Sequence, residues 1–133
     1  MRHRPRPNLR EISDPRIKLS LGLLQKDHVS PPRVEELAAG CNVTSSHFRH
    51  LFKKHVGLSP TQYVKLLRIR AAKKLLRTTF LSVKEVMAAV GENDFSHFVR
   101  HYKYECGETP SETRALEMRR DVRSSRPTRN LGQ

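Results

Sequence analysis

The sequence predicts an all-α fold of seven helices, arranged as two similar units joined by one long helix. Two observations lead to this prediction. Capping residues followed by apolar positions at helical spacing recur along the chain, and a stretch of the first half recurs 49–50 residues later. No segment shows the alternation of apolar and polar residues that is typical of a half-buried strand. A chain of 133 residues makes one domain, or two very small units that share a core.

Each predicted helix begins at a recognisable signal. Proline follows Asp14, Ser59 and Thr109, and it suits the first position of a helix because it lacks the amide hydrogen that would have no partner there. Gly40 is expected to give a tight, left-handed exit from a short helix, and Gly57 to end a longer one. The predicted caps are Asp14, Thr44, Ser59, Ser82, Asp94 and Thr109. The predicted helices extend over residues 15–25, 33–39, 45–55, 60–77, 83–90 and 95–106, with the last beginning at 110.

The internal repeat defines the two units. Residues 34–39 resemble residues 83–88, and after one inserted residue the segment 46–48, Ser-His-Phe, recurs as 96–98. Lysine, glycine and proline at 53, 57 and 60 recur at 103, 107 and 110. Each copy has the order short helix, tight turn, longer helix, which is a helix-turn-helix unit. We therefore predict a first unit at 33–56, a linker helix at 60–78 and a second unit at 82–106.

The longer helix of the first unit has two different faces. Phe48, Phe52 and Val56 form an apolar stripe that we expect to be buried, whereas Ser46, Arg49 and other polar residues lie on the opposite face. Hydrogen-bonding groups near the N-terminus and longer cations behind them are what a helix needs to enter a major groove. The alternative, a merely solvated polar face, is weakened by the second copy of the motif.

The linker helix has a length that suits DNA. About 18 residues at 1.5 Å each span roughly 27 Å, against about 34 Å between major grooves on one side of B-DNA. Residues 58–80 carry six basic and no acidic residues.

Composition restricts the function further. The chain has 26 Lys and Arg against 13 Asp and Glu, a net charge of +13, which favours a polyanionic partner. It contains no apolar run long enough to cross a membrane, no signal peptide, and only two cysteines. The expected location is the cytoplasm, at the nucleoid. The segments 1–13 and 117–133 are predicted to be basic tails, the first of them disordered.

The residues 15–116 resemble the DNA-binding domains of AraC/XylS-type transcription regulators. The first unit and linker carry Ala38-x5-Thr44-x3-Phe48-x3-Phe52-Lys53-x3-Gly57-x2-Pro60-x2-Tyr63 and Arg68-x2-Ala71-x3-Leu75-Leu76. The second unit carries Gly91-x2-Asp94-x-Ser96-x-Phe98-x-Arg100-x-Tyr102-Lys103-x3-Gly107-x-Thr109-Pro110-Ser111-x2-Arg114. The resemblance implies that a domain of seven helices, 14–116, binds promoter DNA through both units.

The resemblance also implies where DNA is contacted. The positions that read bases in the family fall on Ser45, Ser46, Arg49, His50, Phe95, Ser96, Val99 and Arg100. Candidate phosphate contacts beside them are Thr44, Lys53, Lys54, Lys103 and Arg68. The first unit is expected to dominate base reading, because Phe95 and Val99 offer only apolar contacts. The second is expected to hold the DNA backbone or to contact RNA polymerase.

Two residues depart from the family pattern. Glu92 replaces the phenylalanine that usually follows the glycine, so the second turn packs differently or leaves a carboxylate outside. Thr113 replaces a frequent aromatic residue. No sensory domain is recognisable, so neither an effector nor activation versus repression can be predicted, and the domain alone is expected to be a monomer.

Other functions are less well supported. The histidine pairs 47/50 and 97/101 share helix sides but have no third ligand nearby, so no metal or cofactor is predicted. Cys41 and Cys106 lie in different units and are interpreted as small core residues. No catalytic pattern is present, nor the reactive Pro-Cys-His-Arg segment of repair methyltransferases that carry such a domain, so we predict no enzyme. The alternatives that remain are a nonspecific architectural binder of nucleic acid and a polymerase-docking module.

Overall fold

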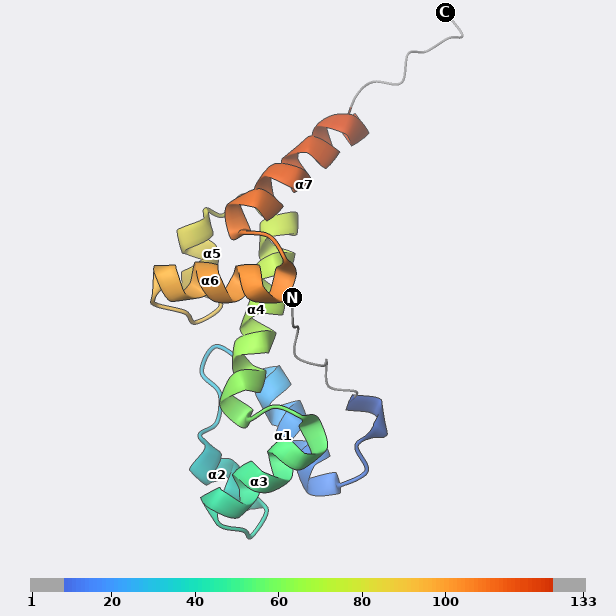
Figure 1. Cartoon of the computed structure of the whole chain (residues 1–133), viewed down its shortest axis with the longest axis vertical. Coiled ribbons are helices and arrows are strands. Elements are labelled where there is room, and N and C mark those ends of the chain that lie inside the picture. Colours follow the sequence, from blue (N-terminus) through green and yellow to red (C-terminus); the bar gives the residue numbers. More distant parts are fainter. Residues whose placement is uncertain (1–8, 126–133) are drawn as a thin grey trace, which may run out of the picture.

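The structure, a computed structural model, describes residues 9–125, and these residues form seven α-helices and no strand. The all-α fold with two units is thereby confirmed. A short 3-10 helix, η1 (Leu9–Glu11), comes first. The α-helices are α1 (Pro15–Lys26), α2 (Val34–Gly40), α3 (Ser45–Val56), α4 (Pro60–Thr78), α5 (Val83–Ala89), α6 (Phe95–Cys106) and α7 (Pro110–Ser125). The molecule is elongated along α4, with α1–α3 at one end and α5–α7 at the other (Figure 1).

The predicted caps form the predicted hydrogen bonds. Thr44 Oγ1 accepts from the amide of His47 at 3.1 Å, and Asp94 Oδ1 accepts from His97 at 3.0 Å. Ser59 makes a full capping box with Gln62, in which each side chain bonds the backbone of the other. Ser82 and Thr109 make the same reciprocal pair with the glutamate three residues on. Because such bonds are local, the start of a helix can be predicted from sequence.

The first unit has its own apolar core. Within α3 the ring centroids of Phe48 and Phe52 are 5.8 Å apart, and Phe52 packs against Tyr63 of α4 with centroids 5.9 Å apart. Helix α1 closes the other side with Ile17 and Leu24, which are both fully buried. The phenol of Tyr63 accepts a hydrogen bond from Gln25 Nε2 at 2.8 Å, so its polar end has a partner.

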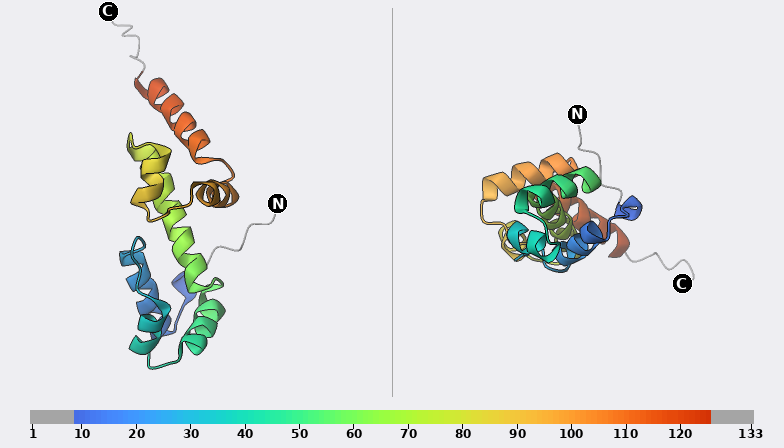
Figure 2. Two further views of the ribbon diagram at one scale, coloured as in Figure 1. Left: turned by 90° about the vertical axis from the view of Figure 1, so that its left-hand side faces the viewer. Right: turned by 90° about the horizontal axis from the view of Figure 1, so that it is seen from below.

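The second unit repeats this arrangement around the other half of α4. Phe98 and Tyr102 of α6 are buried against Ile69 and Leu76 of α4, together with Val86 of α5. Helices α3 and α6 lie on one side of α4, whereas α2 and α5 lie on the other (Figure 2). The linker helix therefore contributes residues to both cores.

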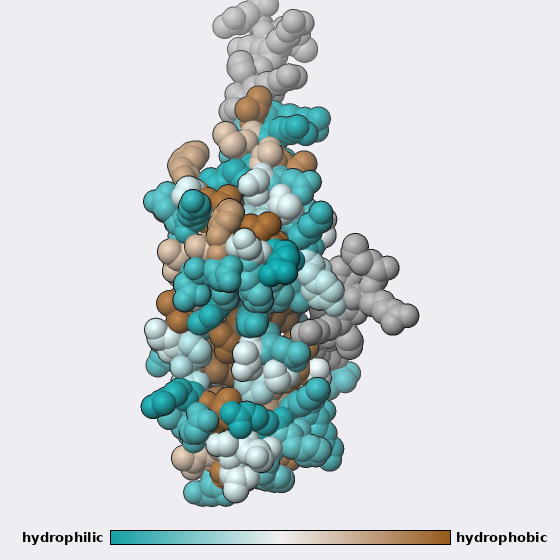
Figure 3. Space-filling model, turned by 60° about the vertical axis from the view of Figure 1, so that its left-hand side comes forward, coloured by the Kyte–Doolittle hydropathy of each residue, from teal (hydrophilic) through white to brown (hydrophobic). Residues whose placement is uncertain are grey.

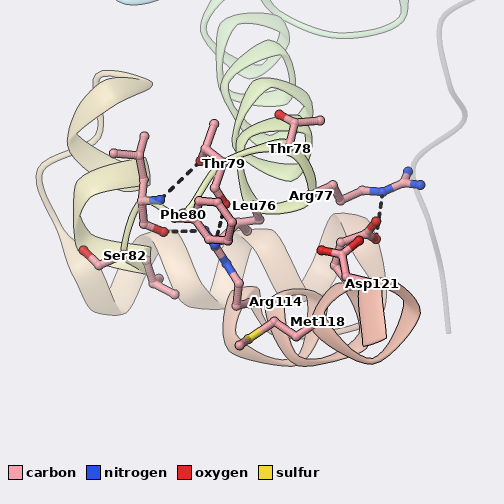
Figure 4. Close-up of a pocket in the computed structure, with 12 residues that line it drawn as sticks. Leu76, Arg77, Thr78, Thr79, Phe80, Ser82, Arg114, Met118 and Asp121 are labelled. Atoms are coloured by element: carbon pink, nitrogen blue, oxygen red, sulfur yellow. Dashed lines mark hydrogen bonds and ion pairs between the residues drawn. The ribbon is translucent and has the colours of Figure 1, made fainter. Parts of the chain in front are cut away.

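An arginine ties α7 to the loop between α4 and α5. Arg114 donates hydrogen bonds to the carbonyl oxygens of Thr79 and Leu81 (Figure 4). A cavity of about 360 Å³ lies beside it, with Phe80 at its edge almost fully exposed. On the other side of the cavity Arg77 of α4 pairs with Glu117 of α7, at 3.4 Å.

Both predicted tails include residues that belong to the folded part of the chain. Ile12 is 4% exposed and packs, with Leu9, against the first core, so residues 9–13 do not form a tail. Helix α7 extends to Ser125, so residues 117–125 are helical, and Glu117 at their start pairs with Arg77 of α4. The remaining parts of both predictions, 1–8 and 126–133, lie outside the described residues.

The prediction for Gly40 was wrong. Gly40 is the last residue of α2, and the left-handed residue of this turn is Asn42, with φ of 57°. Asparagine tolerates this conformation better than most residues. Gly57 and Gly107 do end α3 and α6 in the left-handed region, at φ of 87° and 78°.

Candidate nucleic-acid interface

Helix α3 presents the polar face that the sequence predicted. Its buried side is Phe48, Phe52 and Val56, and its cap at Thr44 fixes where the first turn begins. Ser45, in that first turn, is partly buried. The exposed candidates of this helix are Ser46, Arg49, His50, Lys53 and Lys54. The candidate side chains of the first unit are thus accessible on one helix and its cap.

Arg49 has a partner that sequence reasoning missed. Its Nη2 lies 3.6 Å from Glu35 Oε1 on α2, and the two side chains are 52% and 65% exposed. An ion pair this exposed stabilises the fold by about 1 kcal/mol at most, so Arg49 can leave Glu35 for another partner at small cost. No signal in the sequence relates these two positions, because only the turn geometry brings them together.

Helix α6 matches α3 in length and position. Both helices have 12 residues, begin at a side-chain cap and end at a left-handed glycine. Val99 is partly buried against the second core. The remaining candidates of this unit are exposed: Phe95, Ser96, Arg100 and Lys103.

The exposed ring of Phe95 is covered in part by a lysine. Phe95 is 41% exposed at the first position of α6, and Lys84 Nζ of α5 lies 5.7 Å from its ring centroid. A cation over an aromatic face is attracted to it, so Lys84 holds the ring in place and adds a positive charge beside it. Lys84 was not among the predicted contacts.

Arg68 does not lie where a phosphate contact was predicted. Its side chain is 18% exposed, and Nε donates to the carbonyl of His28 at 2.8 Å. The two Nη atoms bond Val29 O at 3.1 Å and Glu92 Oε1 at 3.3 Å. Arg68 is therefore an internal bridge between the units, and its guanidinium is bonded to protein atoms rather than free for a phosphate.

Of the two departures from the family pattern, Glu92 is partly buried and Thr113 is buried. Glu92 is 14% exposed and paired with Arg68, so the alternative of an outward carboxylate is wrong. Thr113 is 4% exposed, and its hydroxyl lies 2.8 Å from the hydroxyl of Tyr102, which is fully buried. Burial raises the pKa of Tyr102.

Histidines and cysteines make no site of another kind in the described part of the chain. Among residues 9–125 no three His, Cys, Asp or Glu side chains are grouped as metal ligands. Burial lowers the pKa of His101 and raises that of the Cys106 thiol. Both cysteines are free and only partly buried, so they are less enclosed than the predicted core residues. Within the same residues no helix is long and apolar enough to span a bilayer.

The molecular surface around these helices is mainly hydrophilic, with scattered apolar patches (Figure 3). A chain with a net charge of +13 attracts polyanions. Two helix-turn-helix units on one connecting helix, each exposing the polar face of its second helix, define the class of this protein as a helix-turn-helix DNA-binding domain.

Comparison with known proteins gives the family. A family model described as a helix-turn-helix domain matches residues 37–116. The chain is 33% identical over 106 residues to the HTH-type transcriptional regulator CdhR of Pseudomonas aeruginosa. The aligned region covers 79% of this chain and 31% of CdhR. The chain spans about a third of the length of the curated relatives that it matches first.

Solved structures agree with this relationship. The fold matches an AraC-type transcriptional regulator from Chromobacterium violaceum with a TM-score of 0.71 and 25% identity, over 86% of this chain and 96% of that one. It also matches the DNA-binding domain of AdpA, solved in complex with a target DNA, with a TM-score of 0.68 and 28% identity, over 83% and 98% of the two chains. The chain belongs to the AraC/XylS family of helix-turn-helix domains, which is a family of DNA-binding domains and not a class of enzymes.

Proposed function

We propose that this chain is the DNA-binding part of a transcription regulator and that it recognises promoter DNA by sequence, with α3 and α6 in successive major grooves. The observation that carries the proposal is the pair of matched helices, α3 and α6, packed on the single helix α4. The 19 residues of α4 span about 28 Å at 1.5 Å per residue, close to the roughly 34 Å between successive grooves. The DNA complex of the AdpA domain, which has the same fold, supports double-stranded DNA as the partner.

The side chains on α3 favour base reading over binding by charge alone. Ser46 and His50 are exposed in the first half of the helix, where a phosphate clamp would instead favour Lys or Arg. Arg49 carries the fork of donors that bonds the guanine edge at two points. Lys53 and Lys54 follow in the last turns, where they are suited to backbone phosphates.

The two helices are proposed to contribute unequally. On α6 the exposed ring of Phe95 offers an apolar contact for a thymine methyl group, and Arg100 is the one strong hydrogen-bonding candidate besides Ser96. Lys84, above Phe95, adds a charge for the backbone. We therefore assign most base discrimination to α3.

A set of three alanine variants tests the proposal. Arg49→Ala is expected to cost about 1–3 kcal/mol on the preferred site and to relax discrimination at one base pair. Lys53→Ala is expected to weaken binding to preferred and random DNA about equally, because a phosphate contact carries no sequence information. Arg100→Ala is expected to cost less discrimination than Arg49→Ala. The measurement is competition binding with the preferred site, its single-base variants and random DNA at one salt concentration.

Two outcomes would contradict the assignment. If Arg49→Ala weakened binding to preferred and random DNA equally, Arg49 would be a backbone contact. If Arg49→Ala and Arg100→Ala lost equal discrimination, the unequal roles of α3 and α6 would be wrong.

A further inference from the structure

We propose that Arg68 and Glu92 form a latch that fixes the two helix-turn-helix units at one relative orientation and so sets the spacing of the DNA blocks that they read. Both are positioning residues, and neither contacts a base in this account. The inference rests on the proposed DNA reading for its consequence, but the latch itself is tested without DNA.

Arg68 lies at the border between the two cores. On α4, the preceding residue Leu67 packs against the first core, whereas the following Ile69 is buried in the second. The guanidinium is bonded to both sides of this border. Nε and Nη2 bond the α1–α2 loop at His28 O and Val29 O, and Nη1 bonds Glu92 in the α5–α6 turn. One side chain thus links a loop of the first unit to the turn of the second.

The loop and the turn also touch directly. Gly91 has φ of 90°, and a Cβ there would lie 3.0 Å from Val29 O and 3.2 Å from Val29 Cα. A side chain at this position would therefore require the loop to shift by a few tenths of an ångström. Glycine at this position permits the contact, and Arg68 with Glu92 then holds it.

The Arg68–Glu92 ion pair is largely shielded from solvent. The side chains of Arg68 and Glu92 are 18% and 14% exposed, in contrast to the exposed Arg49–Glu35 pair. Separating the pair would leave a largely desolvated carboxylate or guanidinium without its counter-charge, and this costs free energy. The arrangement with the latch closed is therefore preferred over one in which the turn has moved away.

A fixed orientation has a consequence for DNA binding. When one unit is bound, a rigidly held second unit meets its block at high effective concentration. With the latch open, α4 remains the main connection, and the second unit samples more orientations. We expect weaker binding to the best two-block site, on the order of tenfold, and greater tolerance of sites whose blocks are one base pair closer or farther apart.

The test compares three variants of the full chain. Glu92→Ala removes the carboxylate, and Glu92→Gln keeps an acceptor for Arg68 without the charge. Asp121→Asn removes one negative charge from the exposed surface of α7, so it matches the charge change without touching the latch. Amide spectra first establish that each variant is folded. Residual dipolar couplings then report the relative orientation of the two units in free protein.

The latch predicts a graded result. Wild type and Asp121→Asn should fit one alignment tensor for both units. Glu92→Ala should need two tensors of different magnitude, with Glu92→Gln between these extremes. On DNA, only the Glu92 variants should lose the preference for one block spacing, while all proteins keep the same preferred bases within each block.

Two different failures are distinguishable. If Glu92→Ala keeps a single tensor, the latch is wrong, whatever the protein does on DNA. If the tensors separate but wild type shows no sequence preference, the latch stands and the proposed function fails. An unchanged spacing profile in Glu92→Ala, despite separate tensors, would overturn the claim that the latch sets the spacing.

Discussion

Asp14 performs two tasks at the start of α1. Its Oδ1 accepts from the amide of Arg16 at 2.9 Å as the helix cap, and its Oδ2 pairs with Arg16 Nη2 at 2.9 Å. His55, at the end of α3, lies 3.8 Å from the same oxygen. The hydrogen bonds from the Arg16 side chain lower the pKa of Asp14 to about 2.

This pKa predicts how stability changes in acid. Because the folded-state pKa lies below the unfolded value of 3.8, the carboxylate stabilises the fold fully above pH 4, and this contribution is lost as the pH falls toward 2. Asp14→Asn keeps a capping oxygen but not the charge, so its melting temperature should lie below that of wild type at pH 5 and converge with it near pH 2. A constant difference across this range would contradict the account, and carbon-detected titration of Asp14 measures the midpoint directly.

The contact between Tyr102 and Thr113 is one that residue types alone do not predict. From sequence, Thr113 was a departure whose effect could not be assigned. In the structure its hydroxyl is the partner of the buried Tyr102 hydroxyl, 11 positions away in the sequence. A buried polar group without such a partner costs about 1–3 kcal/mol, so the threonine is explained by a contact that spacing does not reveal.

At the scale of the element, glycine has opposite roles at the ends of α2 and α3. Gly57 ends α3 in the left-handed region with open space around it, so only its backbone conformation requires glycine. Gly40 lies inside the last turn of α2, also with open space.

The same substitution should therefore have opposite effects at the two sites. Gly57→Ala should lower the free energy of unfolding by about 1–2 kcal/mol, since an L-residue is strained there. Gly40→Ala should leave it unchanged or raise it by up to about 1 kcal/mol, since alanine restricts the unfolded chain. Urea unfolding of the two variants measures both effects. Destabilisation by both would mean that Gly40 also needs a conformation that alanine cannot adopt.

The elements that sequence predicted best are those fixed by local contacts. Six caps and the matched α3 and α6 follow from residues within one turn of each other, so their bounds agree with the structure to within a residue or two. No end was predicted for the last helix, and its contact with α4 joins Glu117 to Arg77, 40 positions earlier, which local spacing does not reveal. The bridge from Arg68 was missed for the same reason, since its partners come from two distant turns.

The candidate site divides in the same way. Ser46, Arg49, His50 and the matching positions of α6 could be assigned because a helix places them on one face. Their surroundings could not, because Glu35 and Lys84 belong to the preceding helix of each unit. Glu35 pairs with Arg49, and Lys84 lies over the ring of Phe95, so each partner influences the position of a candidate side chain.

At the scale of the whole molecule, α4 is the element that joins the two small units into one molecule. Each unit packs against a different half of it, and the latch at its middle holds the second turn to the first loop. The excess of basic residues supplies attraction to any DNA. Under the proposed function, sequence preference comes from α3 and α6 acting at a fixed separation.

The most direct test of this account is selection of bound sequences from a random pool of double-stranded DNA at near-physiological salt. The account predicts one enriched motif with two blocks about one helical turn apart, roughly 10 base pairs, and stronger base preference in the block read by α3. Tight, salt-sensitive binding with no enriched motif would contradict it, and the chain would then be a binder of DNA by charge.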